Sequence, residues 1–149
     1  MLQKNEPLQV MAKLKDKTKD YHVKLDPLPY FRILIDHKLP LECYVGQLRA
    51  LAIVHAVMES EIATSEDKRI AAVWDERLKK LPLLEKDLEF FEPRVILDIP
   101  SAIEQAIALT DKIRLRRIQS PVTLLGYLYV FEGSTLVNSQ HRPGKLCLV

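Results

Sequence analysis

The chain has 149 residues, the usual size of one domain with one hydrophobic core. Its composition, 48% hydrophobic and 28% charged residues, is that of a soluble globular protein, and a dispersed net charge of +2 gives no argument for nucleic-acid binding. The two cysteines, Cys43 and Cys147, form neither a disulfide framework nor a metal-site spacing. We therefore expect a single domain over residues 1–149 in a reducing compartment.

The N-terminus has no charged stretch followed by an apolar run, so it does not resemble a secretory signal. The longest apolar stretch, YVGQLRALAIVHAVM, is interrupted by Arg49 and falls short of a membrane span. The expected location is the cytoplasm, with no membrane contact.

Apolar residues recur at helical spacing almost throughout, and strand-like alternation is nearly absent. The pattern predicts an all-α bundle without internal repeats. In chain order, the expected helical segments are 8–25, a short piece around residue 31, 41–62, 71–81 after a polar turn, 81–91, 100–113 and 120–136. The residues that set these bounds are Pro27 and Pro29 after the first helix, Pro82 and Pro93 around the fifth, Ser101 as an N-cap with Glu104 three residues on, and Ser120 as an N-cap followed by Pro121.

The segment 41–62 carries the clearest apolar stripe, and His55 lies within it. Two readings of His55 are open: a histidine of the core or of a pocket wall, and a residue that contacts a ligand.

His22 shares one face of the first helix with Lys15, Thr18, Lys19 and Asp26, at helical spacings of three, four and seven. A carboxylate four residues after a histidine can hold one imidazole N–H and leave the other nitrogen free to bind a metal. Lysines beside such a site suit an anionic ligand. The alternative is a solvated helix surface of paired charges.

The last helix contains Gly126 and Gly133, seven residues apart and therefore on one face. Each mid-helix glycine costs roughly 1 kcal/mol relative to alanine, which indicates a close approach to the backbone. That approach is either tight packing of another helix or a flat ligand lying on this face.

Four segments resemble those of the heme oxygenase family, in the family's order. LKDKTKDYHVKLD resembles the proximal helix, in which a threonine four residues before the histidine and an acidic residue four after it are usual. YVGQLRALAIVHAVMESEI and LPLLEKDLEFF resemble the long third helix and the L-x-x-D-L-x-F/W segment. LLGYLYVFEGSTL resembles the bacterial form of the distal helix, with its G-S-T-L-G-G pattern. The resemblance covers about 11–136 and implies a heme-oxygenase-like multi-helix bundle.

The resemblance also implies residue roles on the first helix. His22 would be the proximal ligand of heme iron, with Asp26 as the partner behind its imidazole. Lys15 and Lys19 would face the heme propionates.

On the last helix, the resemblance implies a catalytic role for Gly133 and for Ser134 beside it, where the distal backbone approaches the oxygen-binding side of heme. Family members cleave heme to biliverdin, CO and ferrous iron, with O₂ and with electrons from an external reductase or ferredoxin. The bacterial, biliverdin-producing type supplies phytochromes. The implied partners are therefore heme, an electron-donor protein and a phytochrome that accepts biliverdin.

The chain departs from the family pattern after Leu136, where Val137 and Asn138 replace two expected glycines. Val137 is four residues after Gly133 and shares its face, so its methyl groups would crowd the distal space at about 1–3 kcal/mol. The tail 137–149 resembles nothing in the family, and the family's C-terminal helices are lacking. The alternative function is a non-catalytic, heme-oxygenase-like remnant or binding module that turns over no heme.

Two surface features follow from the same pattern. Without the further helices, we expect the last-helix stripe of Leu124, Leu128 and Phe131 to be partly uncovered. The arginine run 114–117 is read as a solvated helix C-terminus, with a docking patch for an acidic ferredoxin as the alternative.

Overall fold

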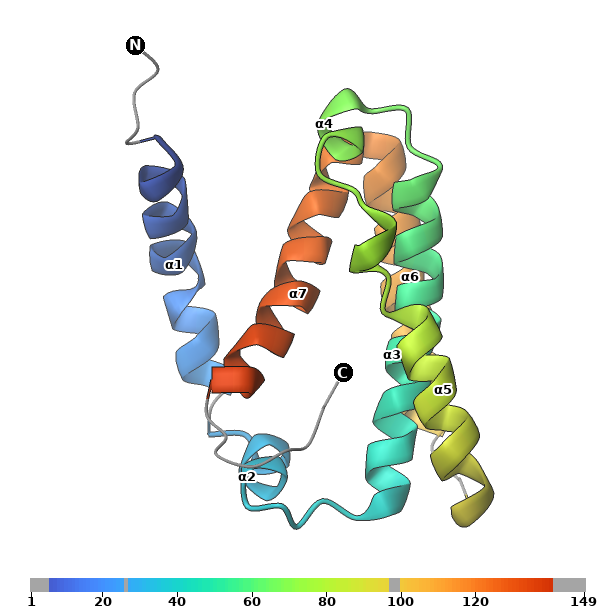
Figure 1. The fold of residues 1–149 in the computed structure, drawn as a ribbon. Helices are drawn as coiled ribbons and strands as arrows, with labels where there is room; N and C mark the ends of the chain where they lie inside the picture. The colour runs from blue at the N-terminus through green and yellow to red at the C-terminus, as the bar shows by residue number, and fades with distance from the viewer. Residues whose placement is uncertain (1–5, 26, 97–99, 141–149) are drawn as a thin grey trace. The chain divides into compact units, whose positions relative to one another are not determined.

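The computed structural model describes residues 6–25, 27–96 and 100–140, without the side chains of 6–8, 10, 11, 35 and 133–140. It divides into two compact units, Met1–Pro40 and Leu41–Val149. Every regular element in the described ranges is a helix (Figure 1), so the predicted all-α fold is confirmed.

The first unit holds two helices, α1 (Glu6–Leu25) and α2 (Pro29–Ile35). α1 ends where the sequence predicts, shortly before Pro27, which cannot continue a helix. α2 has Pro29 in its first turn, where the missing backbone N–H has no intrahelical partner to lose.

The end of α2 is a Schellman motif around His37. The His37 N–H donates to the carbonyl of Leu34 at 3.1 Å, and the Lys38 N–H donates to that of Ile33 at 2.9 Å. His37 has a φ of 56°, a left-handed conformation in which glycine is usual and a side chain is strained.

The second unit runs from α3 to α7. Its elements are α3 (Leu41–Ala63), α4 (Lys68–Ala71), the 3₁₀ turn η1 (Glu76–Leu78), α5 (Leu81–Phe91), η2 (Glu92–Arg94), α6 (Pro100–Gln119), η3 (Pro121–Thr123) and α7 (Leu124–Gln140). α3 is the central helix and packs mainly against α6 and α5, while α7 contacts both α3 and α6 (Figure 1).

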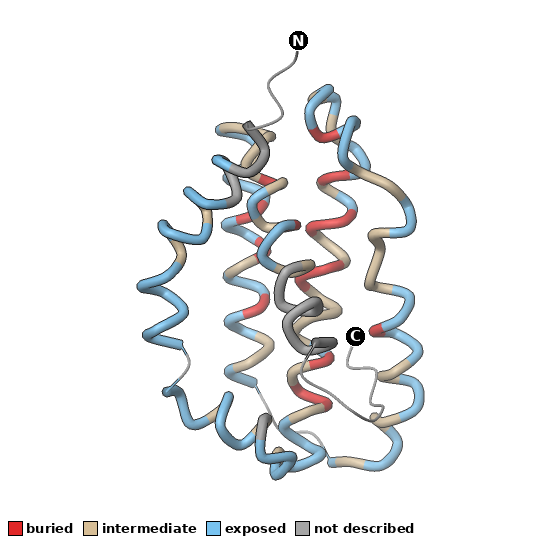
Figure 2. Tube along the Cα trace, turned by 60° about the vertical axis from the view of Figure 1, so that its left-hand side comes forward, coloured by how far each residue is buried: buried red, intermediate tan, exposed pale blue. Residues whose placement is uncertain are grey.

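The core of this unit forms along α3, where buried positions recur from one turn to the next (Figure 2). Most of the predicted apolar stripe of α3 is buried, including Leu48, His55, Met58 and Ile62. The largest cluster joins residues of α3, α4, α6 and α7: Val54, Met58, Ile62, Ile70, Ala106, Ile113, Leu124 and Leu128.

By length and apolar composition, α3 is sufficient to cross a membrane, which differs from the expectation that its apolar stretch falls short of a span. About a third of the relevant window is buried inside the structure. A central helix of a helical bundle passes the same test, and the packing of α3 against α5 and α6 is of that kind.

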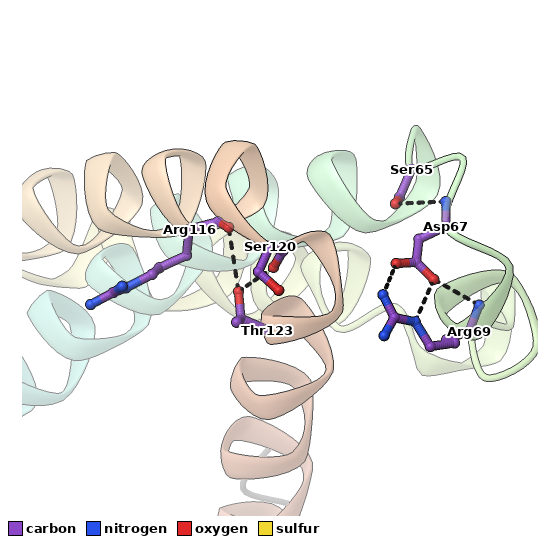
Figure 3. A network of polar contacts seen from close by, with 6 residues as sticks. All are labelled: Ser65, Asp67, Arg69, Arg116, Ser120 and Thr123. Atoms are coloured by element: carbon purple, nitrogen blue, oxygen red, sulfur yellow. Dashed lines mark hydrogen bonds and ion pairs between the residues drawn. The ribbon is translucent and has the colours of Figure 1, made fainter.

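The loop between α3 and α5 is held by aspartate caps. The Asp67 carboxylate accepts hydrogen bonds from the Arg69 guanidinium at 2.6 and 3.0 Å and from the Arg69 backbone N–H at 2.9 Å (Figure 3). These bonds lower the pKa of Asp67 to about 2. Asp75 accepts the same set of bonds from Arg77. The predicted continuous helix over 71–81 is wrong, because the chain leaves α4 at its C-cap and the Asp75 cap starts only the short turn η1.

Two predicted N-caps have different outcomes. α6 begins at Pro100, so Ser101 lies inside the first turn and the predicted capping box is wrong. Ser120 does occupy the N-cap of η3, but its side chain makes no capping hydrogen bond. Instead, the Thr123 hydroxyl donates to the Ser120 carbonyl at 2.8 Å, close to the last turn of α6 (Figure 3).

Candidate functional site

The predicted iron ligand, His22, lies in the last turn of α1 with an exposed imidazole. Lys19 and Lys15 are also exposed, one turn and two turns earlier on the same face. Among the described residues, no hydrogen bond or ion pair involves these three side chains. Asp26, the predicted partner of His22, lies outside the described residues. The structure therefore brings one histidine and two lysines together on an open helix face.

The backbone of this face is regular helix. The Thr18 hydroxyl donates to the Leu14 carbonyl at 2.8 Å, a bond within α1 that turns its polar group away from neighbouring side chains. Tyr21 and Leu25, which flank His22, are exposed apolar side chains. An imidazole between apolar residues and lysines fits a flat apolar ligand that carries a metal and acidic groups.

No cluster of three or more His, Cys, Asp or Glu side chains that could hold a metal occurs in the described ranges. An iron bound at His22 would thus need ligands from another molecule. Heme brings four nitrogen ligands of its own and needs only an axial one from the protein, so a lone accessible histidine fits it.

The second predicted part of the site is the outward face of α7. A Cβ placed on Gly126 would meet nothing within 4 Å, so this glycine does not serve the close packing of another helix within the described residues. Tyr129 and Val130, on the same side of α7, are exposed, Val130 by 60%. This face is apolar and open at Gly126, so a flat ligand stays as a prediction for it.

The residues of α7 with predicted catalytic effects lie further along the helix. The backbone at Gly133, Ser134, Val137 and Asn138 is helical, but their side chains lie outside the described residues. Their predicted roles stay predictions.

The expectation that the opposite stripe of α7 is partly uncovered is wrong for Leu124 and Leu128, whereas Phe131 is only partly buried. Leu124 is 0% and Leu128 is 5% exposed, and both belong to the main core cluster, with Phe131 packed against it. The physical reason is that α3 and α6 already supply the apolar surface that covers this stripe. The exposed apolar side chains of α7 are instead on the Gly126 face.

His55 is a core histidine, and it forms a buried pair that sequence reasoning missed. His55 is 6% and Glu59 4% exposed, and the Nδ1 of His55 lies 2.9 Å from Oε1 of Glu59. The same Oε1 accepts hydrogen bonds from the backbone N–H groups of Lys80 at 2.8 Å and Leu81 at 3.2 Å. In the sequence, this pair is indicated only by the spacing of four between a histidine and a glutamate inside an apolar stripe.

The electrostatics of Glu59 follow from these bonds. Burial by itself raises the pKa of a carboxyl group, but the hydrogen bonds from His55, Lys80 and Leu81 outweigh it and lower the pKa of Glu59. Glu59 is therefore ionised and can only accept, so His55 carries its proton on Nδ1.

The arginine run 114–117 is engaged within the second unit. Arg117 pairs with Glu61 at 2.9 Å and donates to the Thr64 carbonyl at 3.3 Å, and Arg114 lies 3.8 Å from Glu61. These contacts join the C-terminal ends of α6 and α3. They agree with the reading of the run as a helix C-terminus and give no support to a docking patch.

A comparison with curated proteins found no match, and neither did a comparison with solved structures. The family model for heme oxygenase matches residues 8–141, which is most of the chain and includes both helices of the predicted site. The match agrees with the resemblance of the four segments and with the all-α fold. The chain belongs to the heme oxygenase family.

Proposed function

We propose that this protein binds heme through His22 and cleaves it to biliverdin, CO and ferrous iron, as the bacterial, biliverdin-producing members of the family do. The observation that carries the proposal is the exposed His22 with Lys15 and Lys19 on one face of α1. Family membership supports heme as the ligand of that face.

Each residue of the α1 site has a separate role in the proposed binding of heme. The imidazole of His22 would ligate the iron, and the ammonium groups of Lys15 and Lys19 would pair with the propionates and thereby orient the ring. Asp26, four residues after His22 in the sequence, would be the partner of the second imidazole N–H and would fix its tautomer. Bound heme supplies both the iron that activates O₂ and the carbon that is oxidised.

On α7, the backbone at Gly133 and Ser134 lines the oxygen-binding side, where the absence of a Cβ on glycine leaves room for a small ligand. Electrons would come from an external reductase or ferredoxin, as the family resemblance implies. A phytochrome is the proposed acceptor of biliverdin.

A second candidate function is favoured by Val137 and Asn138, which stand where the family pattern has glycines. By helical spacing, Val137 shares the face of Gly133 and would fill the space that O₂ needs. The protein would then bind heme without turning it over.

The test is a hemin titration followed by reductant in air, for the unchanged protein and for His22→Ala. A Soret band that shifts with His22→Ala, together with biliverdin from the unchanged protein, supports the proposal. Heme binding through His22 without biliverdin supports the second candidate. His37→Asn is the matched control, since it removes another exposed histidine of the first unit and asparagine tolerates a positive φ. An unchanged Soret band in His22→Ala contradicts both.

A further inference from the structure

Four residues from three helices form a polar network inside the second unit, in which Glu59 accepts from the backbone N–H of Lys80 and the Lys80 side chain pairs with Glu132. His55 and Glu59 come from α3, Lys80 is the N-cap of α5, and Glu132 belongs to α7. The Nζ of Lys80 lies 3.6 Å from Oε2 of Glu132, and both side chains are about three-quarters buried. Charges so far inside a helical unit are retained only where they are paired.

The network begins as a helix cap supplied from a distant part of the chain. The N-cap residue Lys80 cannot accept a hydrogen bond through its own side chain, so it does not cap the free N–H groups at the start of α5. Glu59 supplies that acceptor from α3, at 2.8 Å from the Lys80 nitrogen and 3.2 Å from the Leu81 nitrogen. The start of α5 is thereby fixed to the middle of α3.

From this fixed point, two contacts reach adjacent residues of α7. The His55 ring meets the Phe131 ring edge-on, with centroids 5.2 Å apart and planes at 64°. The Lys80 ammonium meets the carboxylate of Glu132. The next residues in the chain are Gly133 and Ser134.

We infer that the network of His55, Glu59, Lys80 and Glu132 is a positioning device that sets the placement of the distal backbone at Gly133 and Ser134. The inference rests on the proposed function for the role of that backbone. A glycine can make room for a small ligand only if its helix is held within a fraction of an ångström, and a displacement of about 1 Å can cost as much as 100-fold in rate. The last described side chains before Gly133 are the two that the network holds.

Lys80→Met separates positioning from general stability. The backbone N–H groups of residues 80 and 81 still reach Glu59 in this variant, so the cap of α5 stays and only the link to α7 is lost. Lys80→Arg is the conservative variant that retains the charge. Lys79→Met is the matched control, because the neighbouring Lys79 pairs with Glu76 on η1 and not with α7.

Two measurements are made on each form. The first is amide hydrogen exchange of residues 133–136 in the heme-free protein, which reports how firmly α7 is held. Lys80→Met should raise these exchange rates about tenfold, while Lys80→Arg and Lys79→Met leave them near those of the unchanged protein. Equal exchange in Lys80→Met and the unchanged protein would overturn the inference.

The second measurement is the CO-stretching frequency and CO affinity of the hemin-loaded, reduced protein. Lys80→Met should shift the frequency and weaken CO binding about tenfold, with the affinity for hemin itself unchanged within about threefold. Val45→Ala, a cavity in the buried start of α3, controls for destabilisation alone and should leave the CO frequency unchanged. A CO spectrum insensitive to Lys80→Met would also overturn the inference.

Failure of the proposed function has a different signature. It appears as absent hemin binding, or as binding that does not depend on His22. The exchange rates then decide whether the network holds the 133–134 backbone, because they require no heme.

Discussion

Replacing Glu59 with alanine should destabilise the second unit by about 2–4 kcal/mol. Loss of the cap on α5 contributes about 0.5–2 kcal/mol, because the N–H groups of Lys80 and Leu81 lose their acceptor. The Nδ1–H of His55, buried with no other acceptor among the described residues, adds about 1–3 kcal/mol. Release of the carboxylate from a buried position offsets a part of this sum.

Glu59→Gln separates the charge of this side chain from its hydrogen bonds, because the His55, Lys80 and Leu81 bonds all end on the same Oε1. The amide keeps an oxygen of the same size and position for the N–H groups of Lys80 and Leu81. The hydrogen bonds therefore remain but are no longer charge-assisted, which should lower the free energy of unfolding by about 1 kcal/mol. Urea denaturation followed by far-UV circular dichroism gives the free energy of unfolding for each form. Glu85→Gln, an exposed change on α5, is the control and should differ from the unchanged protein by less than about 0.5 kcal/mol.

The pH dependence provides a second check. Because the pKa of Glu59 is lower in the folded protein than its ordinary value of 4.5, its charge stabilises the fold above that value. This contribution is lost as the pH falls through the folded pKa. The stability difference between the unchanged protein and Glu59→Gln should therefore be constant near neutral pH and shrink below about pH 4.5. If Glu59→Ala had the same free energy of unfolding as Glu85→Gln, the capping of α5 by Glu59 would be refuted. If the stability difference between the unchanged protein and Glu59→Gln grew in acid, the sign of the pKa shift would be refuted.

Three further predictions concern other parts of the chain. Asp67→Asn should destabilise the second unit near neutral pH, and the difference should vanish as the pH falls from 3.8 through about 2, the folded pKa, when unfolding is followed in acid. His37→Gly should raise the stability of the first unit by about 1 kcal/mol in thermal melts, because glycine relieves the positive φ; a lower melting temperature would contradict this. Changing Val137 and Asn138 both to glycine should strengthen CO binding by up to about 1–3 kcal/mol in titrations of the reduced, heme-loaded protein, and equal CO affinity in both forms would show that Val137 is no obstacle.

The sequence predicts the helices well because helical periodicity is a local property. The stripe of α3 and the end of α1 both follow from spacing and from proline. The prediction fails over 71–81, where a cap at Asp75 overrides a sequence that is compatible with helix. It fails again for Leu124 and Leu128, because their burial depends on α3 and α6, which are far away along the chain.

The candidate site divides in the same way. The face of His22 could be predicted from residue spacing, since Lys15, Lys19 and His22 lie within about two turns of one helix. The capping of α5 by Glu59 could not be predicted from the sequence. The donors are the backbone N–H groups of residues 21 and 22 positions further on, and no side-chain pattern marks them. The prediction that heme is the ligand of the His22 face depends on the family resemblance, because residue spacing alone does not identify a ligand.

The outward face of α7 bears on which of the two proposed functions holds. Gly126, Val130, Gly133 and Val137 recur at spacings of four, three and four, so they lie along one face of the helix. At Gly126 this face is open, and nothing stands within 4 Å of an added Cβ. If the proposed heme site is right, the start of this face would limit the binding of a flat ring little, whereas O₂ binding would depend on its end, where Val137 stands one turn beyond Gly133. Heme affinity and heme turnover would then depend on different positions on one helix, and a chain with Val137 would retain the first while losing the second.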